Sequence, residues 1–175
     1  MKQRLLFGMV LLSSIFLKLA AQETIIDFEN GEKALWTNSP EVLSITSEKA
    51  ASGRYSFKYS CATLSSIGEN FQGHFTDKNG FAPGKYTMSF KIWINRKFNG
   101  KSFRINFSKP VSGEPGDWIS SIWEINTLAR EQWVQISKDI IIDYQPKKFF
   151  ISIPANVKLG GEGTFYIDDI KLVKK

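Results

Sequence analysis

The stretch Thr164-Phe165-Tyr166-Ile167-Asp168-Asp169-Ile170-Lys171-Leu172-Val173 places two adjacent carboxylates inside an apolar run that is typical of a β-strand. Phe165 and Ile167 share one face of such a strand, whereas the apolar residues after the acidic pair fall on the other face. The alternation therefore slips by one residue at Asp168-Asp169, which predicts a β-bulge there. Adjacent carboxylates in a strand need a positive partner, which can be a cation, a basic side chain or a row of backbone N–H groups.

The same period-two alternation recurs along most of the chain, and helical periodicity is nearly absent. Turn residues such as Asn79-Gly80 and Asn99-Gly100 separate the alternating runs. Strands at this spacing predict an all-β fold, a two-sheet antiparallel β-sandwich. The predicted strands are Thr24–Phe28, Val42–Thr46, Arg54–Tyr59, Lys85–Asn95, Phe103–Ser108, Trp118–Asn126, Trp133–Ile142, Lys147–Ile153 and Thr164–Val173.

The beginning of the chain has the pattern of a secretory signal peptide. A basic start precedes the apolar stretch Leu5–Phe16, and the small residues Ala20-Ala21 then offer a cleavage site. We therefore expect a signal peptide over residues 1–21 and a single domain over residues 22–175. The predicted location is outside the cytoplasm: the periplasm, the cell surface or the extracellular medium.

Charge and cysteine content narrow the possible partners. Cleavage would remove Lys2, Arg4 and Lys18, so the formal charge falls from +6 to +3. No dense basic stripe remains, so nucleic-acid binding is not supported, and no later stretch is apolar enough to span a bilayer. Cys61 is the only cysteine of the chain, which predicts a buried thiol and no disulfide within the monomer. The sequence does not indicate an oligomeric state.

Several short motifs, in this order along the chain, carry a resemblance to a known family. They are Ile26-Asp27-Phe28-Glu29-Asn30-Gly31, Trp36, Ala51-Ser52-Gly53-Arg54-Tyr55-Ser56-Phe57-Lys58, Gly84-Lys85-Tyr86-Thr87-Met88-Ser89-Phe90, Gln132-Trp133-Val134 and Phe165-Tyr166-Ile167-Asp168-Asp169-Ile170. The chain resembles the jelly-roll carbohydrate-binding modules of the galactose-binding-like superfamily over essentially its whole mature length. The resemblance implies a jelly-roll sandwich that binds a polysaccharide or oligosaccharide without cleaving it.

The resemblance also implies a structural calcium ion between the two terminal strands. Calcium prefers six to eight oxygen ligands from carboxylates and carbonyls. Asp27 and Glu29 would supply carboxylates from the first strand, and Asp168 or Asp169 from the last, with carbonyls of loop 47–53 added. The alternative is that Asp168 accepts backbone N–H bonds while Asp169 pairs with a lysine.

Candidate sugar-binding residues follow from strand alternation. Trp93 shares its parity with Lys91, opposite the apolar face of its strand, so both are expected to point outward. Arg104 and Asn106 alternate outward between phenylalanines on the next strand, and Trp118 follows a loop and is placed at a rim. Together these residues would form one polar-aromatic strip on the outer face of a sheet, although the sequence does not establish that the strands are neighbours.

The other aromatic residues and the single histidine have structural interpretations. We expect Trp133 and Trp123 in the core, Trp36 as a lid over it and His74 as a surface or satisfied histidine. The sequence contains no cysteine–histidine metal cluster, phosphate-binding glycine loop or serine elbow. We therefore predict that the protein is not an enzyme. Two alternatives stay open: a small jelly-roll glycoside hydrolase or lyase, and an adhesion or assembly module whose exposed aromatics contact protein.

Overall fold

The computed structural model describes residues 23–30, 35–64, 70–75, 82–108, 118–146 and 148–175. The predicted signal peptide, residues 1–21, lies outside the described residues. Within the described ranges, no helix is long and apolar enough to cross a membrane.

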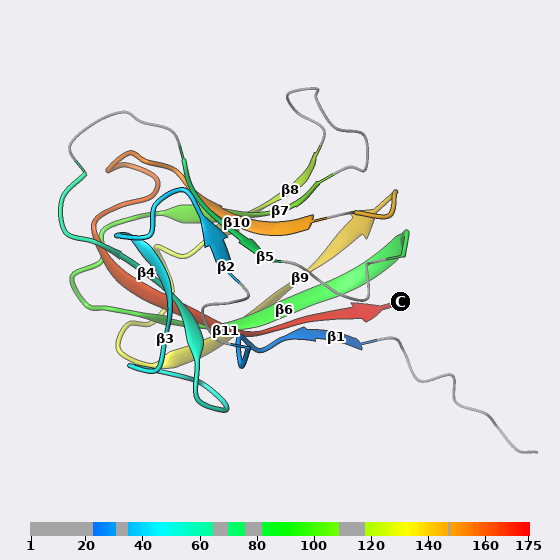
Figure 1. Cartoon of the computed structure of the whole chain (residues 1–175), viewed down its shortest axis with the longest axis horizontal. Coiled ribbons are helices and arrows are strands. Elements are labelled where there is room, and N and C mark those ends of the chain that lie inside the picture. Colours follow the sequence, from blue (N-terminus) through cyan, green and yellow to red (C-terminus); the bar gives the residue numbers. More distant parts are fainter. Residues whose placement is uncertain (1–22, 31–34, 65–69, 76–81, 109–117, 147) are drawn as a thin grey trace, which may run out of the picture.

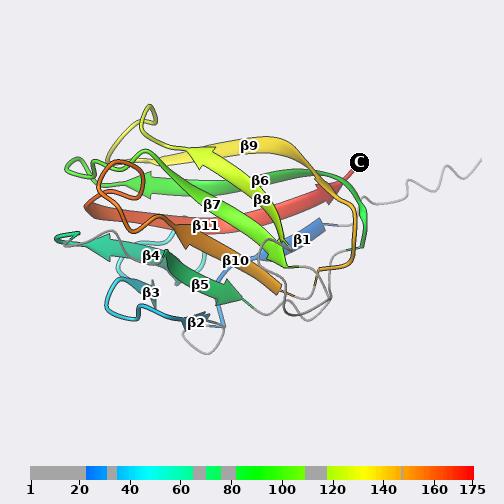
Figure 2. The ribbon, with the colours of Figure 1, turned by 90° about the horizontal axis from the view of Figure 1, so that it is seen from above.

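The described strands form two sheets in which all neighbouring strands are antiparallel (Figures 1 and 2). Sheet A has the order β3-β4-β11-β6-β9, with β1 also paired to β11, and sheet B has the order β2-β5-β10-β7-β8. In sheet A the bounds are β1 Glu23–Ile26, β3 Leu43–Thr46, β4 Ser56–Cys61, β6 Gly84–Ile94, β9 Trp133–Ile142 and β11 Gly163–Lys174. In sheet B they are β2 Leu35–Thr37, β5 Phe71–Phe75, β7 Ser102–Ser108, β8 Trp118–Glu124 and β10 Lys148–Ile153.

The predicted two-sheet sandwich is confirmed, with two strands that the sequence pattern did not reveal. These are β2 and β5, which pair with each other at one edge of sheet B. The strand β2 has only 3 residues, and β5 carries Gly73 at its centre, so neither presents the long run of β-branched and aromatic residues that marks a strand.

Large apolar side chains from both sheets fill the space between the layers. Phe165 of sheet A stacks on Tyr59 with ring centroids 4.9 Å apart and on Phe103 of sheet B at 5.6 Å. All three side chains are fully buried, and they contribute to the apolar burial that holds the sheets together. Two predictions for this core are confirmed, because Trp123 and Cys61 are both buried.

The predicted bulge lies at the acidic pair of β11. The pairing of β11 with β6 shifts register between Asp168 and Lys171, and Asp169 adopts a positive φ of 52°. On its other edge, β11 pairs with β4 before the bulge and with β1 after it. The bulge therefore lies where β11 changes neighbours, and the chain's first and last strands run side by side (Figure 1).

Candidate functional site

The predicted carbohydrate-binding residues do not form one strip. Lys91 and Trp93 lie on the outer face of β6 in sheet A, whereas Arg104 and Asn106 lie on the outer face of β7 in sheet B. The prediction of a single strip is wrong because the chain crosses from one layer to the other between β6 and β7. The β6 pair and the β7 pair therefore face opposite sides of the sandwich. Trp118 begins β8 opposite Ser108, but its side chain is not among the described ones.

Trp93 is half-buried among charged and aromatic neighbours on sheet A. The Lys49 ammonium lies 4.1 Å from the centre of its ring, and the Tyr166 ring packs edge-on at 5.6 Å. Trp133 of β9 is the register partner of Trp93, so it lies on this outer face, and the prediction of a core tryptophan is wrong. The parity of β9 explains the error, since Val134 and Ile136 take the inward positions.

The outer face of sheet B carries a line of side chains that crosses all five strands. Register pairing joins each residue to the next, so the line runs perpendicular to the strands over about 19 Å. We call it the cross-strand row: Trp36 of β2, His74 of β5, Phe150 of β10, Asn106 of β7 and Ser120 of β8.

One end of the cross-strand row is a stack of three rings. Trp36 packs edge-on to His74 with ring centroids 4.9 Å apart, and His74 stacks on Phe150 at 4.8 Å with ring planes 16° apart. Trp36 is nevertheless 64% exposed, so the expectation that it covers the core is wrong. Because β2 is the edge strand of sheet B, no further strand shields this ring among the described residues. The exposed aromatic surface is the ring of Trp36, which packs on His74, and His74 in turn stacks on Phe150.

Two polar atoms in the same row are buried and have no hydrogen-bond partner among the described residues. They are Oδ1 of Asn106, a residue only 3% exposed, and Nδ1 of His74. His74 Nε2 lies 3.0 Å from the Gln72 side-chain oxygen, so the proton belongs on Nε2 and Nδ1 is an acceptor. Burial lowers the pKa of His74, and the positive charge of Lys148 lowers it further, so the neutral ring is favoured. Both atoms are therefore acceptors that lack a donor.

Polar and apolar groups flank the cross-strand row along the neighbouring strands. Arg104 is exposed one outward position from Asn106, between Ser152 of β10 and Ile122 of β8 in register. Ile122 is 51% exposed. Arg104 and Asn106 thus belong to this face as predicted from alternation, while Trp36, His74 and Phe150 were missed as site residues. The short alternation of Phe71, Gln72, Gly73, His74 and Phe75 was the sequence signal that could have placed His74 on this face.

The four acidic residues of the predicted calcium site are held by protein donors, and we call them the acidic clasp: Asp27, Glu29, Asp168 and Asp169. Asp168 accepts N–H bonds from Ala51 at 2.7 Å, Ser52 at 3.2 Å and Asp169 at 2.8 Å. Burial raises the pKa of Asp168 despite these donors. Asp169 pairs with the Lys91 ammonium at 2.7 Å and accepts a bond from the Ser52 hydroxyl.

Glu29 completes the acidic clasp from the first strand's side. Its Oε1 accepts N–H bonds from Arg54 and Tyr55, each at 2.8 Å, and Asp27 accepts one from the Glu29 N–H at 3.1 Å. Gly53 has φ 59°, a conformation that favours glycine, and a Cβ there would lie 2.5 Å from the Glu29 carboxylate oxygen and displace it from its N–H donors.

Protein donors thus already occupy oxygens that a calcium ion would need. In the described part of the chain, no group of three His, Cys, Asp or Glu side chains is arranged to hold a metal ion. Calcium binding stays a prediction of the family resemblance alone, because the hydrogen bonds of the acidic clasp do not require it.

Comparisons with known proteins show the fold. No protein-family model matches the chain, and no curated protein matches it significantly. Among solved structures, it is similar to a family-22 xylan-binding domain of Xyn10C from Paenibacillus barcinonensis, with a TM-score of 0.60 and 16% identity over 87% of this chain and 99% of that one.

Two further structures share this architecture. The K2 cleaved adhesin domain of Lys-gingipain gives a TM-score of 0.61 at 14% identity over 87% of this chain and 99% of that domain. A family-16 carbohydrate-binding module gives 0.55 at 17% identity over 85% of this chain and 96% of that module. The chain therefore has the jelly-roll fold of carbohydrate-binding modules.

Proposed function

We propose that this protein binds a glycan, without cleaving it, on the outer face of sheet B. The observation that carries the proposal is the exposed ring of Trp36 at one end of the cross-strand row, with two acceptors without donors, Asn106 Oδ1 and His74 Nδ1, buried just beneath the same face. A buried acceptor without a donor is costly, so a ligand that brings donors gains affinity there.

Glycan chemistry matches this face. An apolar face of the sugar ring can pack on Trp36, and its hydroxyl groups can donate hydrogen bonds to the two acceptors once the side chains that cover these atoms move aside. The cross-strand row spans about 19 Å, which suits an oligosaccharide better than a single sugar. Because one structural neighbour is a xylan-binding domain, xylan is the first glycan to test.

The test is a glycan array followed by affinity electrophoresis in gels that contain the bound polysaccharide. Trp36→Ala is expected to weaken binding roughly tenfold, because it removes one exposed aromatic surface. Ile141→Ala is the matched control: Ile141 is 63% exposed on the outer face of sheet A, so its loss is expected to leave retardation unchanged. Absence of binding to every glycan would overturn the proposal, as would equal effects of the two variants.

The similarity to an adhesin domain favours one second candidate, in which the same exposed rings contact a protein. The two functions are distinguished by competition. A protein partner whose capture persists in saturating oligosaccharide, and is lost in Trp36→Ala, would support the adhesion function over the glycan-binding one.

Export is part of the proposed function. Removal of residues 1–21 would release the β-sandwich outside the cytoplasm, where polysaccharides are available. Mass spectrometry of the protein from the periplasm or medium is expected to give an N-terminus at Gln22. A chain that keeps Met1 and stays in the cytoplasm would contradict this part.

A further inference from the structure

The strand β9 forms one border of sheet A and has an open backbone edge. It pairs with β6 in unbroken register over all 10 of its residues, Trp133–Ile142. Within the described ranges, no strand pairs with its other edge and no backbone hydrogen bond reaches that edge. Figure 2 shows β9 along the upper rim of the molecule. Because alternate residues of such a strand present their N–H and C=O groups sideways, the edge is a template for a further strand.

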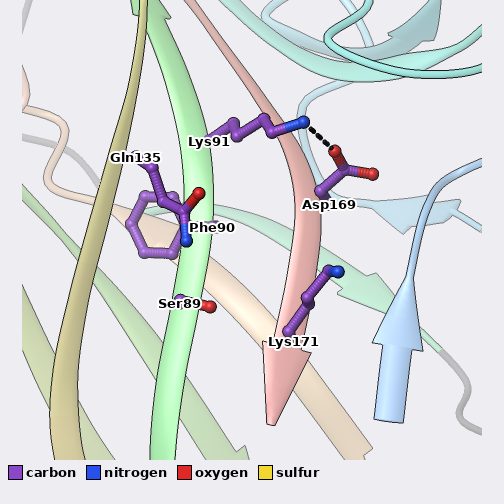
Figure 3. Close-up of a pocket in the computed structure, with 6 residues that line it drawn as sticks. All are labelled: Ser89, Phe90, Lys91, Gln135, Asp169 and Lys171. Carbon is purple, nitrogen blue, oxygen red and sulfur yellow. Dashed lines mark ion pairs between the residues drawn. The ribbon is translucent and has the colours of Figure 1, made fainter. Parts of the chain in front are cut away.

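The long polar side chains of β9 turn away from this open edge. The Lys138 side chain crosses to β8 of sheet B, where its ammonium donates to the Ile122 carbonyl and lies 4.5 Å from the centre of the Trp123 ring. A lysine on an edge strand often discourages further pairing, but this one is directed at β8. Gln135 leans over β6, where it lines a hollow of about 200 Å³ (Figure 3). Neither side chain therefore projects across the edge.

The outward residues of β9 form a self-complementary pattern: Trp133, Gln135, Ser137, Asp139 and Ile141. Antiparallel pairing with a second copy, centred on Ser137, places Trp133 of each copy opposite Ile141 of the other. Ile141 is 63% exposed, and Trp133 keeps part of its surface exposed. Aromatic and β-branched residues make favourable cross-strand pairs, and the remaining outward pair joins an uncharged amide to a carboxylate. This register therefore covers both exposed apolar side chains.

Other registers lose this match. A centre on Lys138 or on Asp139 places two like charges directly opposite each other, which is destabilising. A centre on Gln135 or on Ile136 leaves the exposed Ile141 beyond the end of the partner strand. Centres nearer either end of β9 shorten the overlap. The pattern of β9 thus selects one register, and the strand that fits it is a second β9.

We propose that β9 is a self-association edge, at which a second copy of this chain adds its own β9 in an antiparallel pair centred on Ser137. The two copies are related by a two-fold axis normal to sheet A, so sheet A continues across the dimer. Both outer faces of sheet B then point to the same side, and the dimer presents two cross-strand rows to one polysaccharide. This last consequence rests on the proposed function, whereas the strand pairing does not.

The association is expected to be weak. One strand pair buries less area than a standard stable interface, so we expect a dissociation constant on the order of 100 μM. At the low micromolar concentrations of affinity electrophoresis the protein is then a monomer, and Ile141→Ala remains a valid control for glycan binding. The dimer forms where the protein is concentrated, as on a polysaccharide surface.

The experiment is sedimentation equilibrium of the mature protein without glycan, from about 10 μM to about 1 mM, a range that brackets the expected dissociation constant. The weight-average mass is expected to rise with concentration from that of a monomer toward that of a dimer. Ser137→Lys places two ammonium groups opposite each other on the two-fold axis, so it should weaken association at least about fivefold. Ser137→Glu should do the same with two carboxylates.

An equimolar mixture of these two variants tests the register itself. Association is expected to return, because a lysine then faces a glutamate across the axis. The matched control is Ser47→Lys, which adds the same charge at an exposed position just after β3, at the opposite border of sheet A. It should leave association unchanged.

Three results would overturn the proposal. One is the mass of a monomer at every concentration. The second is an equal loss in Ser137→Lys and Ser47→Lys, which would indicate unspecific charge repulsion. The third is a mixture that associates no better than either variant alone, which would place the contact elsewhere. Because the measurement contains no glycan, failure of the proposed pairing is distinguishable from failure of the sheet B site.

Discussion

The outer faces of the two sheets differ in whether their buried polar side chains have partners. On sheet A, Asp168 and Asp169 are matched by N–H donors and by Lys91. On sheet B, Asn106 and His74 keep acceptors without donors beside an exposed ring. Paired charges of the first kind stabilise the fold, whereas the unpaired acceptors leave hydrogen bonds for a ligand to complete. This difference supports the proposal that the acidic clasp stabilises the fold and that the cross-strand row binds neutral glycans.

The largest expected effect is on stability, from Asp168→Ala. Its side chain is fully buried, and its removal leaves the N–H groups of Ala51 and Ser52 without their acceptor. We expect the free energy of unfolding to fall by about 2–4 kcal/mol in urea denaturation, with the glycan affinity of the folded protein unchanged. The control is Asp139→Ala on the exposed part of sheet A, which should change little. Comparable stabilities of the two variants would contradict the role of the clasp.

The second prediction concerns sheet B, where we expect a substitution to lower the glycan affinity without lowering the stability. Asn106→Leu is nearly isosteric and removes the unpartnered Oδ1, so stability should stay the same or rise. Affinity for a neutral glycan should fall roughly five- to tenfold, the value of one lost hydrogen bond. Isothermal titration calorimetry and urea denaturation measure the two effects, with exposed Asn126→Leu as control. A loss of stability with full affinity would reverse the roles that we assign to the faces.

The acidic motif of β11 and the binding face show which features of the structure can be predicted from the sequence and which cannot. The slip of alternation predicted the bulge, and the spacing of the alternating runs predicted the sandwich, because both depend on local sequence. The binding face was predicted only in part. Alternation determines that Trp93 and Arg104 point outward, but it carries no information on which sheet each strand joins. That depends on long-range pairing, such as the contact of β10 with β5 and β7.

The third prediction concerns pH and is expected to be smaller. The pKa of His74 is lowered by burial, so the unfolded chain takes up this proton first as the pH falls below about 6.5. The free energy of unfolding should therefore fall between pH 6.5 and the folded pKa. Glycan affinity should fall several-fold once the ring is protonated, because Nδ1 becomes a donor. The difference between wild type and His74→Phe isolates this term, and a difference that is constant with pH would contradict it.

The smallest expected effect is that of a chelator. Because protein donors already occupy the clasp oxygens, we expect EDTA to leave the melting temperature unchanged. A ligand of the native state must stabilise it, so a fall in EDTA that calcium restores would favour the calcium site implied by the family resemblance. Either result also tests sheet A alone, since the clasp and the cross-strand row lie on opposite faces.

The central claim, that glycans bind the outer face of sheet B, is tested most directly by mapping the bound surface. The measurement is an NMR titration of the ¹⁵N-labelled protein with a neutral oligosaccharide of the glycan that binds on the array. We predict that the largest amide shifts fall on β2, β5, β10 and β7, and include His74 and Asn106. Shifts confined to β6, β9 and β11, with His74 and Asn106 unmoved at saturation, would contradict the account.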